Sequence, residues 1–386
     1  MCYVRAYIEV IGWKWKPVLK RGVRISKVGG SLLTSGNVLS VIGRVVGRDY
    51  VGNKLILVVS AMKGITDLLI RAFDNHDPNA LDVVVSMYVN EALNLGLNDL
   101  ASFLELMREE LRRFINLGEP WVRDHVIVHG ELFSVLLIER LLNDVLGLRA
   151  KAVYEPGIVT DSNWGFASVN HELSNRYVIE RLGNVLSKYD IVVVPGFLGV
   201  TSDGRYTSLG RGGSDYTASL LANYLNVSQL TFYTDSGGLL TGDPRIVSDP
   251  VLLREVSYEE AYIASMLGAK KFHPRTFEPL LKSRVLTVIT DPWHDSGTYV
   301  TNNCVSMPKL TTVNEAGNDL FRVSVVGCRI SQIDDLRNEI HKVVLSYDVS
   351  TVKDEGPHAV SALLKDRDNA ISLARDLHRW VRSWIA

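Results

Sequence analysis

The chain has 386 residues, of which 46% are apolar and 22% are charged, and this length predicts two or three domains with cores of their own. Its 42 Lys and Arg against 43 Asp and Glu give a net charge of −1, which excludes an overall field that attracts nucleic acid or an anionic membrane. No apolar run reaches the roughly 20 residues of a membrane span, so we expect a cytoplasmic protein that binds neither nucleic acid nor membrane.

Apolar stretches that end at glycine, proline or small polar residues predict buried strands, and helical patterns lie between them. The predicted strands are 23–28, 55–59, 191–194, 230–233 and 285–290, and the predicted helices are 81–117, 131–146, 215–225 and 258–267. Strands that are separated by long helical connections favour parallel pairing. The predicted fold class is therefore α/β, with a mainly parallel central sheet sandwiched by helices.

The last part of the chain predicts a small α+β domain. The segment 307–319 is rich in Pro, Thr, Asn and Gly and shows little periodicity, which is typical of a linker. The elements expected after it are strand 320–326, helix 333–345, strands 349–352 and 359–364, and helix 369–384. We therefore divide the chain into an extension at 1–22, a main domain at 23–306, a linker at 307–319, and a small domain at 320–386 that lacks a closing strand.

The three cysteines are Cys2, Cys304 and Cys328. They are odd in number and far apart in the sequence, a pattern that fits neither a disulfide framework nor a zinc site.

Four polar clusters follow predicted strands, and ligands of open parallel sheets bind at the carboxyl ends of strands. In the first cluster, Gly29 and Gly30 would let the backbone approach an anion that Lys27 also reaches, although a plain turn is the favoured explanation of the two glycines taken alone. The second cluster contains Ser60 and Thr66, and a helix N-cap is an equally good explanation for it.

The third cluster, 207–215, runs directly into a predicted helix. A helix N-terminus with glycines and a cation favours an anion. Capping explains Ser214 and Asp215 but not the Gly-Arg-Gly-Gly sequence around Arg211. The fourth cluster begins at 234–238 and continues through 242–245, where Asp-Pro also signals a turn. Glycine, hydroxyl and cation at strand ends indicate a protein that binds a phosphorylated ligand.

In this order, the clusters resemble those of the aspartokinases, a branch of the amino acid kinase family. The likeness runs from about 23 to 302 and is most specific at 207–218, with support from 129–131, 234–245 and 268–276. The nucleotide-binding positions that the resemblance implies are Lys27, Gly29, Gly30, Ser31, Thr234, Asp235, Leu240, Arg245 and Lys270. The implied substrate-binding positions are Ser60, Thr66, Glu131, Arg211, Ser214 and Asp215.

The resemblance also implies roles. Lys27, Asp215 and Lys270 would be catalytic. Glu131 would bind the ammonium of the amino acid and Arg211 its α-carboxylate. ATP and Mg²⁺ would be the cofactors, with Mg²⁺ held mainly by the phosphates and Asp215 nearby. The implied partners are L-aspartate as substrate and further copies of the chain in a homodimer or higher homo-oligomer, and the small domain would be a single unit of the ACT type.

The implied reaction is ATP-dependent phosphorylation of the β-carboxylate of L-aspartate to 4-phospho-L-aspartate, the first step toward lysine, threonine and methionine. An aspartate β-carboxylate, with a pKa of about 3.9, is ionised at neutral pH and needs no general base. Catalysis would therefore rest on positioning and cationic charge. Two alternatives stay open: a kinase of another acidic amino acid, and a non-catalytic regulatory paralogue that binds nucleotide or amino acid.

Overall fold

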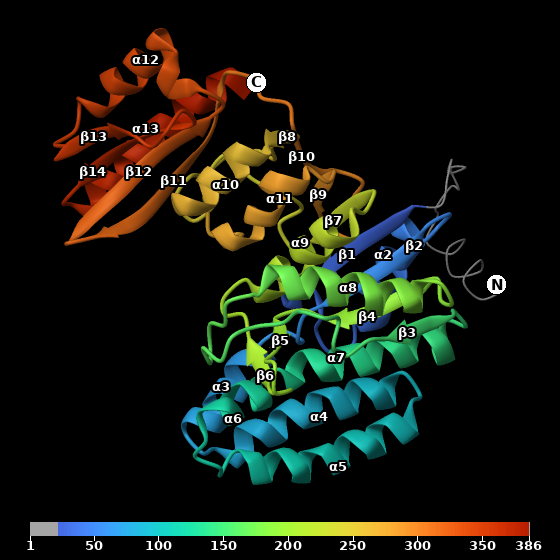
Figure 1. Cartoon of the computed structure of the whole chain (residues 1–386). Coiled ribbons are helices and arrows are strands. Elements are labelled where there is room, and N and C mark those ends of the chain that lie inside the picture. The colour runs from blue at the N-terminus through green and yellow to red at the C-terminus, as the bar shows by residue number, and fades with distance from the viewer. Residues whose placement is uncertain (1–21, 386) are drawn as a thin grey trace. The chain divides into compact units, whose positions relative to one another are not determined.

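The computed structural model describes residues 22–385 (Figure 1). The chain forms two compact units that divide between Asp235 and Ser236, and each is described by itself. The predicted extension, except for Gly22, and Cys2 lie outside the described residues. Among residues 22–385, no helix is both long and apolar enough to cross a membrane.

The first unit contains a parallel sheet. Its strands are, in spatial order, β3 (Ala150–Ala152), β4 (Ile191–Pro195), β2 (Lys54–Val59), β1 (Val23–Val28) and β7 (Gln229–Tyr233), and each neighbouring pair is parallel. The predicted strands of this region are confirmed. Of these five strands, β3, a strand of three residues, was not among those predicted. A short antiparallel hairpin, β5 (Leu198–Val200) and β6 (Tyr206–Ser208), follows β4.

Helices cover both faces of this sheet, which confirms the predicted sandwich. The helices of this unit are α2 (Val38–Asp49), α3 (Ile65–Asp74), α4 (Pro78–Asn94), α5 (Asn98–Phe114), α6 (Pro120–Ile127), α7 (His129–Arg140), α8 (His171–Leu186) and α9 (Gly213–Leu225), of which α4 and α5 pack against other helices rather than on the sheet. The predicted helix 81–117 is wrong in one respect, because it consists of two helices, α4 and α5, that lie side by side (Figure 1). Gly96, with a φ of +74°, permits the turn between them.

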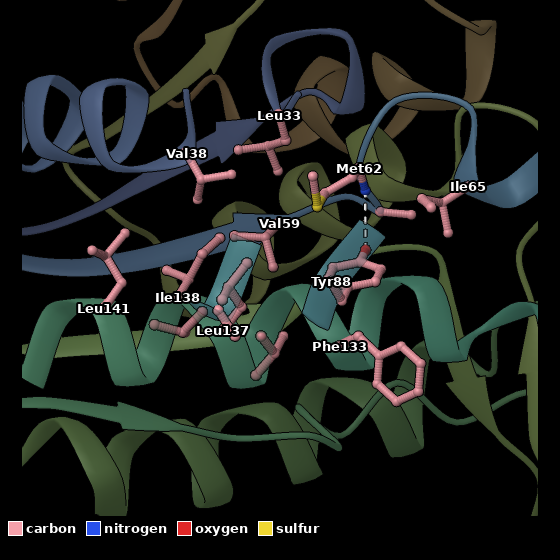
Figure 2. Close-up of a cluster of buried hydrophobic side chains, with 14 of the residues drawn as sticks. Leu33, Val38, Val59, Met62, Ile65, Tyr88, Phe133, Leu137, Ile138 and Leu141 are labelled. Carbon is pink, nitrogen blue, oxygen red and sulfur yellow. Dashed lines mark hydrogen bonds between the residues drawn. The ribbon is translucent and has the colours of Figure 1, made fainter. Parts of the chain in front are cut away.

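The core of the first unit packs apolar side chains of α2 and α7 against one face of the sheet. Val59 of β2 lies among Val38, Ile138 and Leu141 (Figure 2). Tyr88 of α4 is buried in the same cluster and uses its hydroxyl fully: it accepts from the Met62 N–H at 3.1 Å and donates to the Gly130 carbonyl at 2.7 Å. Tyr88 therefore ties the loop after β2 to the start of α7.

Substitution Tyr88→Phe is expected to lower the free energy of unfolding by about 2 kcal/mol, because the buried Met62 N–H then has no acceptor from this side chain. Urea denaturation measures the change. Tyr177→Phe, at an exposed tyrosine of the same unit, is the matched control and should stay within about 0.5 kcal/mol of the unchanged protein. Equal stability of the two variants would show that the Tyr88 hydroxyl contributes nothing.

The second unit begins with β8 (Glu255–Ser257), α10 (Tyr258–Met266), α11 (Glu278–Ser283), β9 (Thr287–Thr290) and β10 (Gly297–Thr301). Strand β10 pairs antiparallel with β9 and parallel with β8. Helix α10 starts at a capping box, in which the Ser257 hydroxyl accepts from the Glu260 N–H and the Glu260 carboxylate accepts from the Ser257 N–H. The predicted helix 258–267 and strand 285–290 agree with α10 and β9.

The small C-terminal domain is an antiparallel sheet with helices. Its elements are β11 (Pro308–Gly317), β12 (Leu320–Gly327), α12 (Asp334–Val344), β13 (Thr351–Asp354), β14 (Ala359–Leu364) and α13 (Arg367–Ile385), and the strand order is β11-β12-β14-β13. Apolar side chains of α12 and α13 pack with those of β12 and β14. The domain is α+β, as predicted.

The predicted linker 307–319 is wrong, because most of it is strand β11. Its Thr and Asn residues weakened the apolar pattern, but pairing with β12 satisfies its backbone, and the hairpin turns at Asn318 and Asp319, both with positive φ. Strand β11 is also the strand that the domain seemed to lack: it pairs with the free edge of β12 from the N-terminal side.

The reading of the cysteines is also wrong for one pair. Cys304 and Cys328 form a disulfide, with their Cα atoms 5.4 Å apart. Sequence spacing does not reveal this pair, because only the β11–β12 hairpin brings the two positions together.

Candidate active site

A cavity of about 380 Å³ opens in the first unit at the carboxyl ends of β1 and β2 and at the start of α9. Nine of the residues predicted for the site line it: Lys27, Gly30, Ser31, Ser60, Thr66, Glu131, Arg211, Ser214 and Asp215. They come from four separate parts of the chain. The fold thus brings the first three sequence clusters and the 129–131 segment together around one cavity.

An ion pair of Lys27 and Asp215 lies in this cavity. The Lys27 Nζ is 2.6 Å from an Asp215 carboxylate oxygen, and Lys27 as a whole is only 8% exposed. Lys27 is in β1 and Asp215 is in the first turn of α9, where the left-handed Gly212, with a φ of +74°, turns the chain into the helix. A nearly buried ammonium is held here by one carboxylate, at a helix N-terminus that itself favours anions.

Glu131, in the first turn of α7, is the most perturbed acid of the cavity. One of its carboxylate oxygens accepts from the Ala61 N–H at 3.2 Å, while the other is buried and has no hydrogen-bond partner among residues 22–385. Burial raises the pKa of Glu131 to about 8, against a smaller lowering by the Ala61 N–H and by Lys27. An orphaned carboxylate oxygen in a cavity is a ready acceptor for a cationic ligand.

Gly30 sits where a side chain does not fit. A Cβ at this position would lie 2.6 Å from the Ala61 carbonyl oxygen, which belongs to the backbone and cannot rotate away. The neighbouring Gly29 N–H donates to the Tyr233 carbonyl at 3.2 Å. The two glycines therefore let the chain after β1 pass close to the loop after β2, so that both loops line one cavity.

The loop that carries Arg211 is held by a buried carboxylate that the sequence did not single out. Asp124, in α6, accepts from the Ser208 N–H at 2.8 Å, from the Ser208 hydroxyl at 3.0 Å and from the Gly165 N–H at 2.9 Å. Asp124 thus supports the chain three residues before Arg211. No local pattern could have found it, because its partners lie 41 and 84 residues further along the chain.

The residues that line the cavity also include positions that were not predicted for the site, among them Lys63 and Phe197. Lys63 belongs to the second sequence cluster and adds an exposed cation to the cavity. Phe197 is the second residue after β4, directly after Gly196, and has a φ of +66°. The sequence signal for Lys63 is its place within a polar cluster after a predicted strand. Phe197 has no charged or hydroxyl group, so its side chain gives no such signal.

The remaining predicted positions are not among the residues that line the cavity. Gly29 directly follows β1, and Thr234 and Asp235 directly follow β7 in the first unit. Leu240, Arg245 and Lys270 belong to the second unit, where Arg245 forms a two-bond fork with Asp243, at 2.9 and 2.6 Å, that holds the pKa of this carboxyl below its usual range. Their contact with a nucleotide stays a prediction.

Comparison with known proteins assigns the family. The model of the amino acid kinase family matches residues 22–291, which include every predicted site residue. The chain belongs to the amino acid kinase family. Its fold agrees with this: aspartokinase III of E. coli, in a crystal structure with aspartate and ADP, superposes with a TM-score of 0.82 over 92% of this chain and 99% of that one, at 20% identity.

Curated relatives of this amino acid kinase include several aspartokinases. Over 303 residues it is 30% identical to lysine-sensitive aspartokinase 3 of Escherichia coli (strain K12), an alignment that covers 74% of this chain and 65% of that protein. It is also 30% identical over 312 residues to the aspartokinase of Geobacillus stearothermophilus, an alignment that covers 79% of this chain and 66% of that protein. The chain thus spans less than two thirds of the length of the Escherichia coli relative.

Proposed function

We propose that this amino acid kinase transfers the γ-phosphoryl group of ATP to the β-carboxylate of L-aspartate, yielding 4-phospho-L-aspartate for the synthesis of lysine, threonine and methionine. One observation carries the proposal: the orphaned oxygen of Glu131 shares a cavity with Arg211 and with the Lys27–Asp215 pair. The cavity therefore offers an acceptor for an ammonium, a donor for a carboxylate and a cation for a phosphoryl group. The names of the curated relatives support the same reaction.

In this proposal the amino acid binds through its two charged ends. Its ammonium donates to the unpartnered oxygen of Glu131, and its α-carboxylate accepts from the guanidinium of Arg211, a planar donor suited to carboxylates. Hydroxyls of Ser60, Thr66 and Ser214, all of which line the cavity, add neutral hydrogen bonds. These contacts fix the side-chain carboxylate of the substrate relative to Lys27.

The chemical step then needs little beyond position and charge. An oxygen of the ionised β-carboxylate forms a bond to the γ-phosphorus, and the bond from that phosphorus to the β,γ-bridging oxygen breaks, so that ADP leaves with the electron pair. Lys27 stabilises the negative charge of the transferring group, and Asp215 holds Lys27 in place. No residue has to remove a proton from the nucleophile.

The proposed cofactors are ATP and Mg²⁺. The donor set fits a magnesium ion that is bound mostly by phosphate: Asp215 is a carboxylate in the cavity, and it is already paired with Lys27. When bound, the ion would neutralise phosphate charge. Contacts of the nucleotide with Thr234, Asp235, Leu240, Arg245 and Lys270, homodimer formation and a cytoplasmic location are further parts of the proposal, which rest on the family resemblance.

The deciding experiment measures ADP release by the purified chain with Mg-ATP and either L-aspartate, L-glutamate or no acceptor, with hydroxylamine present to trap an acyl phosphate. We expect release that depends on L-aspartate and yields aspartyl hydroxamate. Turnover with L-glutamate but not with L-aspartate would favour a kinase of another acidic amino acid. A folded chain that binds ATP but turns over neither substrate would favour a regulatory paralogue.

A further inference from the structure

Two cysteines and one histidine of the second unit form a cluster that the proposed reaction does not use. Cys304 lies between β10 and β11, and Cys328 directly follows β12. The disulfide between them has a Cα separation of 5.4 Å, within the usual range. A ring nitrogen of His358 lies within 4.8 Å of both sulfur atoms.

This cluster sits at the open end of the β11–β12 hairpin, whose strands run side by side (Figure 1). Pro308 pairs with Gly327 at that end of the ladder, and the Gly327 N–H then donates across to the His358 carbonyl at 3.0 Å. The disulfide therefore closes the end of the hairpin opposite its turn. It fixes the segment that leads into β11, the strand that completes the small sheet.

The state of His358 favours redox chemistry over metal binding. Its Nδ1 accepts from the Arg329 N–H at 3.2 Å, and burial lowers the pKa of the ring, so the neutral imidazole carries its proton on Nε2. A metal ion binds an unprotonated ring nitrogen. It would therefore have to break the hydrogen bond from the Arg329 N–H to Nδ1, or replace the proton on Nε2. A ring N–H is instead a donor that stabilises a thiolate beside it.

We propose that Cys304 and Cys328 form a reversible thiol–disulfide exchange site that locks β11 onto β12, with His358 stabilising the thiolate that reduction releases. The other reactant is a small-molecule thiol or its disulfide, such as glutathione. Cys328 is fully buried whereas Cys304 is not, so Cys304 is the sulfur that an external thiolate reaches.

The exchange balances in two steps. The external thiolate bonds to the Cys304 sulfur, the bond between the cysteines breaks, and Cys328 leaves as a thiolate that then takes a proton. A second external thiol attacks the mixed disulfide, forms an external disulfide and leaves Cys304 as a thiol. Two external thiols are oxidised to one disulfide while the protein disulfide is reduced to two thiols.

The test compares the same protein in two redox states. It therefore needs no variant of Cys304 or Cys328 that might fail to fold. The third thiol is removed with Cys2→Ser, and the protein is equilibrated with mixtures of reduced and oxidised glutathione. We expect no reactive thiol in the oxidised form after denaturation, two in the reduced form, and a single reversible transition between them. Amides of 302–307 and 327–329 should exchange with deuterium at least tenfold faster after reduction.

The role of His358 is tested by the rate of reduction with dithiothreitol. His358→Gln should slow it at least fivefold, while His341→Gln, in α12 of the same domain, should leave it unchanged. Four results would overturn the proposal: two thiols that stay reduced in oxidised glutathione, equal deuterium exchange in both forms, equal reduction rates of the two variants, or tight binding of one Co²⁺ per reduced chain with thiolate-to-cobalt absorption.

Discussion

Replacement of Lys27 by alanine is expected to lower the rate of aspartate phosphorylation by about a thousandfold while the protein stays folded. The ammonium of Lys27 is the nearly buried cation of the cavity, 2.6 Å from Asp215. A donor that acts on developing charge in such a site contributes about 10²–10³ to the rate. Its loss also leaves the Asp215 carboxylate facing the phosphates, which repels them. The measurement is kcat from ADP release at saturating aspartate.

Two further variants make this result specific. Lys188→Ala removes an exposed lysine just after α8 and should keep full activity, which controls for the loss of one positive charge. Asp215→Asn keeps Lys27 but removes its carboxylate partner, so we expect a smaller loss than in Lys27→Ala. If Lys27→Ala kept more than a tenth of the activity, phosphoryl transfer would not depend on this cation.

Those parts of the fold and the site that rest on local pattern could be predicted from the sequence. The continuous apolar runs of β2 and β4 and the alternating pattern of β1 identify strands without reference to the rest of the chain, and the Gly-Arg-Gly-Gly sequence before Asp215 predicts a helix start suited to an anion. The family resemblance implied that Asp215 organises Lys27, but no local pattern in the sequence joins the two residues. Their pairing at 2.6 Å follows only from the order of the strands.

The parts that could not be predicted depend on contacts between distant segments. Asp124 looks like an ordinary helix acid until Ser208, 84 residues later, folds against it. Strand β11 looks like a linker, because its own residues do not reveal the pairing with β12 that satisfies its backbone. The same hairpin creates the disulfide of Cys304 with Cys328. Local propensity is a weak guide wherever tertiary contacts decide.

Replacement of Glu131 by glutamine is expected to raise the KM for L-aspartate by about 10–100-fold with little change in the KM for ATP. The substrate ammonium would lose a charge-assisted hydrogen bond in a buried place, an interaction that is worth about 1.5–3 kcal/mol. Glutamine preserves the volume of the side chain and can still accept from the Ala61 N–H, so the loop after β2 should stay in position. A KM within threefold of the unchanged enzyme would show that Glu131 does not bind the ammonium.

The pH dependence of the same parameter gives an independent test. Burial raises the pKa of Glu131 to about 8, so below that pH most free enzyme carries a protonated, neutral Glu131. The substrate ammonium binds the ionised form and must release this proton. The KM for aspartate should therefore fall up to tenfold per unit as pH rises from about 6 to 8 and then level off. In Glu131→Gln, this contribution to the pH profile should vanish.

The stability of the ligand-free protein should fall as pH rises, whereas aspartate binding improves. The reason is that no substrate ammonium is present to compensate the buried charge of Glu131. The pKa of Glu131 is higher in the folded chain than the ordinary value of 4.5, so the folded protein holds this proton more tightly than the unfolded one. The stability that Glu131 contributes is therefore complete below about pH 4.5 and is lost as pH rises toward 8, by up to about 1.4 kcal/mol per unit. Urea denaturation of the enzyme and of Glu131→Gln across this range should show a difference that grows with pH. Added L-aspartate should reduce that difference, since the ammonium then occupies the partner position that the free enzyme leaves to a proton.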